Sequence, residues 1–239
     1  MDQSIKKALQ AERLYLILAG LFIASLVAGN LIFQKFFHWD FFGIYTFELS
    51  VGILPYPVTF LITDLIAEIY GKRRANQVVI AGLGATMFVL LILSLANAAP
   101  ATDYSPVNDR IFTQVFGLAP LAVAASMIAY LLAQLVDIRL YHFWKDFTKG
   151  KHLWLRNNAS TMTSQFVDTA SVLFLLCLFQ AIEWNLFWPL LWSGFFFKVM
   201  IAALDTPILY LLVYSVRRHF DLEVDQEIRR QGSFKINSH

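Results

Sequence analysis

The stretch PVTFLITDLIAEIYGKRR, residues 57–74, places two carboxylates inside a segment that is otherwise apolar enough for a lipid bilayer. Asp64 and Glu68 are four residues apart, so a helix carries them one above the other on one face. An ionised group at mid-bilayer is costly and is retained where it faces a polar cavity, a partner or a substrate. The stretch therefore predicts a membrane helix with a polar site, which makes transport the leading hypothesis.

The composition supports a membrane protein. Of 239 residues, 58% are hydrophobic and only 15% are charged, whereas a soluble domain carries about a quarter charged residues. The net charge of +2 gives no reason to expect a nucleic-acid partner. No cleavable signal peptide is expected, because the first apolar run is long enough to span a bilayer. Cys177 is the single cysteine, so we expect a buried apolar role and no intrachain disulfide.

Six apolar runs of bilayer length predict an all-α integral membrane protein, a six-transmembrane-helix bundle in a single domain covering residues 1–239. The expected spans are about 14–33, 49–70, 75–96, 116–140, 160–182 and 189–214, followed by a charged cytoplasmic tail over 217–239. Pro55 and Pro57 interrupt helical hydrogen bonding near the start of the second span.

The distribution of cations predicts the orientation. Lysines and arginines cluster before the first span, at 72–74, between 139 and 156, and after Arg217, whereas the opposite side has only Lys35 and Arg110. Cytoplasmic loops carry the excess of positive charge, so both termini are expected in the cytoplasm.

The carboxylates of the second span admit two interpretations. Two stacked carboxylates repel, which favours a protonated form or hydrogen bonds to a substrate amidine group. Alternatively, Glu68 only pairs with Lys72, four residues further on. Asp64 lies deeper in the span, and for it we favour the site interpretation.

A second polar segment, RNNASTMTSQFVDT at residues 156–169, opens the fifth span. Thr161, Ser164, Gln165 and Asp168 fall at helical spacing and share one face. Small hydroxyl residues alone would indicate helix packing. Gln165 and Asp168, an amide and a carboxylate one turn apart, favour a site for a planar heterocycle with donors and acceptors along its edge.

Further polar residues lie inside the remaining spans. Lys198 and Asp205 are seven residues apart, two turns along one face of the sixth span. Lys198 either neutralises one of Asp64, Asp168 and Asp205 or belongs to the site. Asn30 is a lone amide near the external end of the first span. We therefore predict a shared pocket of Asp64, Glu68, Gln165 and Asp168, with Asn30 and Lys198 at its rim.

Motifs for other functions are missing from the sequence. It has no phosphate-binding glycine loop, no HExxH and no paired Cys/His cluster, and no histidine lies within an expected span. We therefore expect neither an enzyme nor a bound metal or cofactor.

Three segments carry a family resemblance: PVTFLITDLIAEIYGKRRA (57–75), RNNASTMTSQFVDT (156–169) and FKVMIAALDTP (197–207). They resemble the signature segments of the queuosine precursor transporter family, a branch of the vitamin uptake transporters. The resemblance implies a bacterial inner-membrane protein, similar to the six-helix substrate-binding subunits of energy-coupling-factor transporters. It also implies import of 7-cyano-7-deazaguanine or its aminomethyl relative for tRNA modification.

The chemistry of such a purine-like substrate suits the predicted residues. A deazaguanine offers N1–H and an exocyclic amine to a carboxylate and an O6 acceptor to an amide donor. Two alternatives remain open: a binding subunit that needs a separate energising ATPase complex, or a non-transporting membrane scaffold. The sequence leaves the driving force, the preferred base and homo-oligomerisation undetermined.

Overall fold

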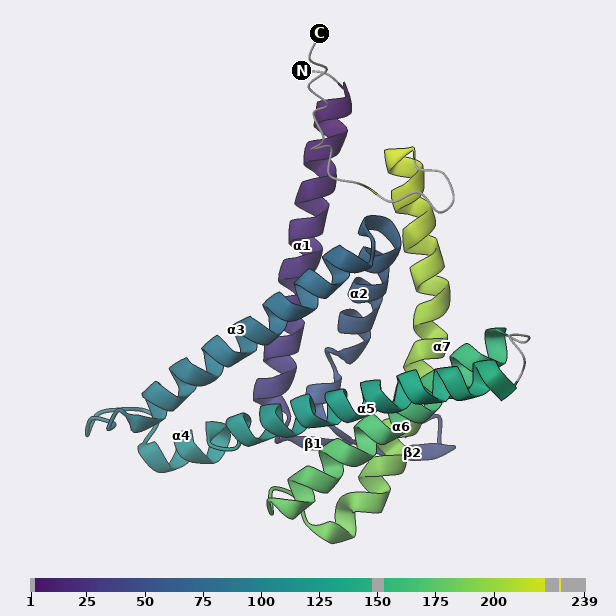
Figure 1. Cartoon of the computed structure of the whole chain (residues 1–239). Helices are drawn as coiled ribbons and strands as arrows, with labels where there is room; N and C mark the ends of the chain where they lie inside the picture. Colours follow the sequence, from purple (N-terminus) through teal and green to yellow (C-terminus); the bar gives the residue numbers. More distant parts are fainter. Residues whose placement is uncertain (1–2, 148–152, 222–227, 229–239) are drawn as a thin grey trace. The chain divides into compact units, whose positions relative to one another are not determined.

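The computed structural model describes residues 3–147, 153–221 and 228, and these residues are almost entirely helical (Figure 1). Five described segments are long and apolar enough to cross a membrane: Ile5–Ile32, Val51–Tyr70, Lys72–Ala98, Asp109–Ala129 and Trp184–Phe220. A further apolar segment, Met162–Leu178, is shorter. The helical membrane class is confirmed in this coarse form, while six spans and a likeness to energy-coupling-factor subunits stay predictions.

Contacts divide the chain into two compact units. The first comprises Met1–Val27, Pro55–Thr86 and Leu204–His239, and the second comprises Ala28–Leu54 and Met87–Ala203. Each unit has its own apolar core. The prediction of a single domain remains untested. Of the expected charged tail, residues 222–227 and 229–239 lie outside the described residues.

The first unit contains the beginning of α1 (Gln3–Ile32), α2 (Tyr56–Tyr70), the beginning of α3 (Lys72–Ala98) and the end of α7 (Phe187–Phe220). These segments meet around a core whose buried side chains include Phe22, Ile66, Ile69, Val78 and Val213. The long helices α1 and α7 extend beyond the expected spans of 14–33 and 189–214, and Pro207 lies inside α7 without ending it.

Helix α2 begins inside the second expected span. It starts at Tyr56, after the N-cap residue Pro55 and with Pro57 in its first turn, within an apolar segment of bilayer length that covers Val51–Tyr70. The interruption predicted from the prolines is therefore present, because proline fits the first turn but not a helix interior. Helix α2 ends at Tyr70, its C-cap residue Gly71 has a φ of 85° that favours glycine, and α3 starts at Lys72.

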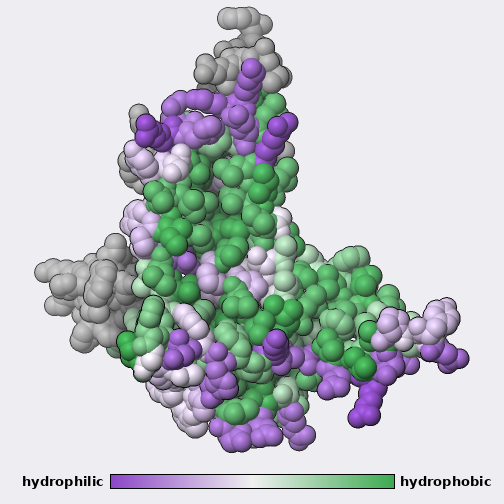
Figure 2. Space-filling view, turned by 180° about the vertical axis from the view of Figure 1, so that it is seen from behind, coloured by the Kyte–Doolittle hydropathy of each residue, from purple (hydrophilic) through white to green (hydrophobic). Residues whose placement is uncertain are grey.

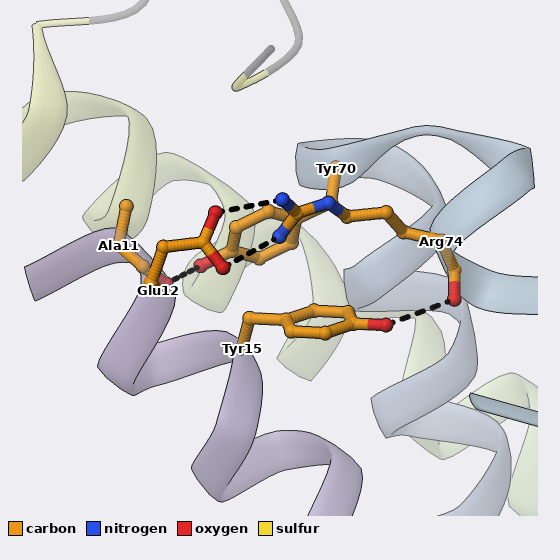
Figure 3. A network of polar contacts seen from close by, with 5 residues as sticks. All are labelled: Ala11, Glu12, Tyr15, Tyr70 and Arg74. Atoms are coloured by element: carbon orange, nitrogen blue, oxygen red, sulfur yellow. Dashed lines mark hydrogen bonds and ion pairs between the residues drawn. The ribbon is translucent and has the colours of Figure 1, made fainter. Parts of the chain in front are cut away.

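A polar network fixes α1 to the corner between α2 and α3 (Figure 3). Arg74 forms a two-pronged ion pair with Glu12, at 2.6 and 3.1 Å, and its guanidinium lies over the rings of Tyr15 and Tyr70. The Tyr70 hydroxyl donates to the Ala11 carbonyl at 2.8 Å. Charge, stacking and hydrogen bonding thus act on the same arginine, which holds this corner in place.

Hydropathy differs along the first unit. Figure 2 shows hydrophilic side chains at the upper end of the drawn face, where α1 begins, with hydrophobic ones directly below them; other hydrophilic groups lie along its lower edge and at the right. The described cations of this unit belong to the first turns of α1, the start of α3 and the last turn of α7. This is the end that the charge distribution assigns to the cytoplasm.

The second unit contains a β-hairpin that the all-α prediction did not include. Strands β1 (Phe36–Phe41) and β2 (Tyr45–Ser50) pair antiparallel, with His38 opposite Glu48. Phe42 and Gly43 make the turn with positive φ. Both strands are rich in aromatic residues, which favour a pleated, half-buried surface. The connection between the first two expected spans is therefore ordered structure.

The remainder of the second unit is helical. Asn108 caps α4 (Asp109–Phe116), and α5 (Ala119–Phe147) packs beside α6 (Leu153–Leu178) in Figure 1. A short 3-10 turn, Trp184–Leu186, leads into α7. Cys177 is a buried free thiol in the core of this unit, as expected.

Candidate functional site

An ion pair between two helices forms the centre of the candidate site. The Lys198 Nζ on α7 lies 2.7 Å from the Asp168 Oδ2 on α6, and it donates a hydrogen bond to that oxygen. The Lys198 side chain is 12% exposed and the Asp168 side chain 27%. Of the three acids considered as partners for Lys198, the structure thus assigns Asp168. Two charges this sheltered from solvent stabilise each other because water no longer solvates them fully.

A cavity of about 160 Å³ borders this ion pair. The hairpin and the following turn contribute Phe36, Glu48, Leu49, Ser50 and Ile53, α6 contributes Thr169, Val172 and Leu173, and α7 contributes Leu190, Gly194 and Lys198. An apolar cavity of about 150 Å³ can hold benzene, so this volume admits a small planar ring compound. The lining is mostly apolar with a few polar groups, which is the usual composition of a small-molecule site.

Buried hydrogen bonds position the hairpin over α7. Ser193 is 1% exposed, and its hydroxyl oxygen accepts from the backbone N–H of Glu48 at 3.1 Å and lies 3.3 Å from the Tyr45 hydroxyl. Phe47 and Leu49 pack against Phe197 beside it. The side of the cavity that carries Glu48 is therefore held by contacts with the helix that carries Lys198.

The polar side chains of the cavity have different hydrogen-bond and ion-pair partners. Ser50 donates to the Phe33 carbonyl and accepts from the N–H of Gly52. Thr169 donates to the Gln165 carbonyl, which leaves its oxygen able to accept. The Glu48 Oε1 lies 3.4 Å from the Nε2 of His38 on the neighbouring strand. The cavity thus combines an ammonium, a carboxylate and hydroxyl acceptors.

A glycine lets α6 and α7 approach closely beside the ion pair. A Cβ at Gly194 would meet the Thr169 Cγ2 at 3.3 Å. A larger residue at this position would occupy space beside the cavity. The absence of a side chain at Gly194 therefore helps to keep the cavity open.

The two carboxylates of α2 belong to the first unit. Asp64 and Glu68 are both exposed, and Glu68 pairs with Arg217 of α7 at 2.6 Å. The alternative interpretation, in which Glu68 pairs with Lys72, is therefore wrong, because the partner of Glu68 is Arg217. Asp205 interacts electrostatically with Asp64, and the Asp205 Oδ2 is buried without a hydrogen-bond partner among the described residues. A pocket shared by Asp64, Glu68, Gln165 and Asp168 stays a prediction.

Other predicted residues are placed but not brought into the cavity lining. Asn30 lies on the last part of α1, and Gln165 lies one turn before Asp168 on α6. Both are half-buried. The side chain of Thr161 lies outside the described residues.

Glu48 and Ser50 line the cavity but were not predicted as site residues. Both occur in YTFELS, where polar and apolar residues alternate with the period of a strand. This alternation, together with the aromatic residues and Gly43 before it, is the signal that would have identified the hairpin.

Comparison with known proteins identifies the family. A family model described as "Putative vitamin uptake transporter" matches residues 50–212, more than half of the chain. The chain belongs to this vitamin uptake transporter family. The match includes every residue of the predicted site except Asn30, and it begins after Glu48. The family consists of transporters, so the expectation that this protein is not an enzyme is confirmed.

One curated relative of this vitamin uptake transporter is informative. A Bacillus subtilis protein named "Probable queuosine precursor transporter" is 27% identical over 132 residues, which cover 54% of this chain and 56% of the relative. The chain thus matches about half the length of that relative. No solved structure matches the transporter. The resemblance found in the sequence to this group of proteins is confirmed.

Proposed function

We propose that this transporter imports queuosine precursors, 7-cyano-7-deazaguanine, 7-aminomethyl-7-deazaguanine or both, across the bacterial inner membrane. The name of the Bacillus subtilis relative supports this substrate class. The observation that carries the proposal is the cavity of about 160 Å³ beside the Lys198–Asp168 ion pair. Its volume suits a flat heterocycle, and its charged groups suit the edge of a guanine-like base.

The groups of the base suggest a role for each side chain. The Glu48 carboxylate accepts the N1–H and the exocyclic amine, because its two oxygens match two adjacent donors. Lys198 donates to O6, and Asp168 holds the ammonium in place. The apolar walls formed by Phe36, Ile53 and neighbouring residues contact the ring faces. A site built for these groups rejects a base that lacks them, because its own polar groups would be left unpaired.

The orientation inferred from the charges agrees with uptake. With both termini in the cytoplasm, the hairpin between α1 and α2 lies on the external side. The cavity beneath the hairpin then belongs to the external half of the protein, where a substrate arrives. We keep four further residues as proposed substrate-binding residues: Asn30, Gln165, Asp64 and Glu68. A variant of each belongs in the binding assay.

The direct test is uptake of labelled deazaguanine by cells that cannot synthesise the base. Cells with the gene should accumulate label, and cells without it should not. A protonophore arm and an arm lacking any energising ATPase complex distinguish the driving forces. Glu48→Gln should lower the affinity of purified protein about ten- to a hundredfold, because one acceptor oxygen becomes a donor.

A matched control is Glu183→Gln, which alters an exposed carboxylate in the loop before α7. It should bind and transport as the wild type does. Asp64→Asn, Glu68→Gln, Gln165→Ala and Asn30→Ala complete the panel. Wild-type accumulation in cells without the gene, or full binding by Glu48→Gln, would contradict the proposal.

A further inference from the structure

A groove lies between α1 and the last turns of α7, in the first unit. It has a volume of about 380 Å³ and is lined by Gln10 and Leu14 from α1 and by Ser215, Val216, His219 and Phe220 from α7. Apolar side chains alternate here with groups that form hydrogen bonds. Neither the predicted substrate site nor the family comparison accounts for this groove.

The spacing of residues along α1 and α7 places three cations beside the groove. On α1, Lys6 precedes Gln10 by four residues and Arg13 follows it by three, so all three share one face. On α7, Arg218 follows Ser215 by three residues and is exposed, as are Lys6 and Arg13. Within the described part of the chain, none of the three cations forms an ion pair.

Two described carboxylates near the groove, Asp221 and Glu12, are already paired with other cations. Asp221 pairs with Lys7, which holds the pKa of that carboxyl below its usual value. Glu12 pairs with Arg74. Among the residues that the structure describes, positive charge therefore remains in excess around the groove. The imidazole of His219 lines the groove itself and can form hydrogen bonds there.

The surroundings of the groove match the two halves of a phospholipid. Leu14, Val216 and Phe220 offer apolar surface to acyl chains. The guanidinium groups of Arg13 and Arg218 can each bind two oxygens of one phosphate. Clusters of basic residues at the end of membrane helices attract anionic lipids. A lipid headgroup would fit at this end of α7, because the basic last turn of the helix lies where its apolar segment ends.

We propose that this groove binds one anionic phospholipid, with its phosphate on Lys6, Arg13 and Arg218 and its acyl chains along Leu14, Val216 and Phe220. The proposal does not depend on the transported substrate. It requires only that the helices lie in a membrane.

The experiment compares phosphatidylglycerol with phosphatidylcholine on purified full-length protein in detergent. We expect phosphatidylglycerol to raise the thermal unfolding midpoint more than phosphatidylcholine does. The triple variant Lys6→Gln, Arg13→Gln and Arg218→Gln should lose this difference. The control Lys72→Gln with Arg73→Gln removes exposed cations of the same unit outside the groove, and it should keep the difference.

Native mass spectrometry of each single variant supplies a second measurement if the triple variant fails to fold. Each single change should lower phosphatidylglycerol retention about fivefold. Equal stabilisation of wild type and triple variant would overturn the proposal. An equal loss in the control would show diffuse charge attraction in place of a site. Full reproduction of the stabilisation by inorganic phosphate would show an anion site without a lipid.

Discussion

Lys198 and Asp168 lie thirty residues apart in sequence, and the structure joins them through an ion pair of 2.7 Å between α7 and α6. Removing one partner leaves a charge in a partly dehydrated place. Lys198→Met and Asp168→Leu should each destabilise the protein by about 1–3 kcal/mol, less than for a fully buried pair because Asp168 is partly exposed. The thermal unfolding midpoint in detergent measures this loss.

The double variant Lys198→Met with Asp168→Leu tests whether the pair acts as a unit. Two apolar side chains leave no unpaired charge, so the double variant should be more stable than the sum of the single losses predicts. Simple addition of the two losses would show that each residue is stabilised by other partners.

The anchor of the hairpin gives a second prediction. Ser193→Ala removes the acceptor of the Glu48 backbone N–H and should cost about 1–2 kcal/mol, since this partly buried donor loses its partner. Substrate affinity should fall as well, because Glu48 is then held less firmly. Ser94→Ala is the control, since Ser94 is exposed and its hydroxyl donates to the Leu90 carbonyl within the same helix, α3. Equal effects of the two changes on binding would contradict a role for the anchor.

Backbone packing beside the hairpin gives a third prediction. A Cβ at Gly52 would lie 2.7 Å from the carbonyl oxygen of Gly29 and 2.9 Å from the Phe33 Cβ. Gly52→Ala should therefore reduce the yield of folded protein strongly, because backbone atoms cannot move aside as a flexible side chain can. Gly84→Ala, where no atom lies within 4 Å of the new Cβ, should fold normally. Comparable yields of the two variants would show that this close approach is not required.

The network around Arg74 gives a fourth prediction. Arg74→Lys keeps the charge but loses the two-pronged contact with Glu12 and the stacking on Tyr15, which should cost about 1–2 kcal/mol. Arg73→Lys changes an exposed neighbour and should have little effect. The thermal unfolding midpoints of the two variants measure this difference in stability. Identical midpoints would show that the guanidinium group of Arg74 does not stabilise the protein more than an ammonium group does.

Topology is the fifth prediction. Reporter fusions after Arg74 and after Arg156 should read cytoplasmic, and fusions near Tyr104 and in the hairpin turn at Gly43 should read external. An external signal after Arg156 would refute six spans with both termini inside. An internal signal at Gly43 would place the cavity on the cytoplasmic side and would contradict its proposed role in capturing external substrate.

Several features could be predicted from residue order because they arise within one segment. The helical membrane class follows from apolar run length, and the late start of α2 follows from Pro55 and Pro57, whose missing N–H groups act locally. The signature segments were sufficient for the family. The extra length of α1 and α7 was not predicted, because the apolar runs end before the helices do.

The candidate site required tertiary structure. The sequence by itself identified Asp168 and Lys198 as chemically unusual, since charges within apolar runs are costly wherever they lie. Only the packing of α6 against α7 decided that Lys198 pairs with Asp168, and only the packing of α2 against α7 decided that Glu68 pairs with Arg217 in place of Lys72. Only the folding of the hairpin onto Ser193 placed Glu48 in the cavity lining. Ion-pair partners and cavities depend on distances between segments remote in sequence, which local spacing does not determine.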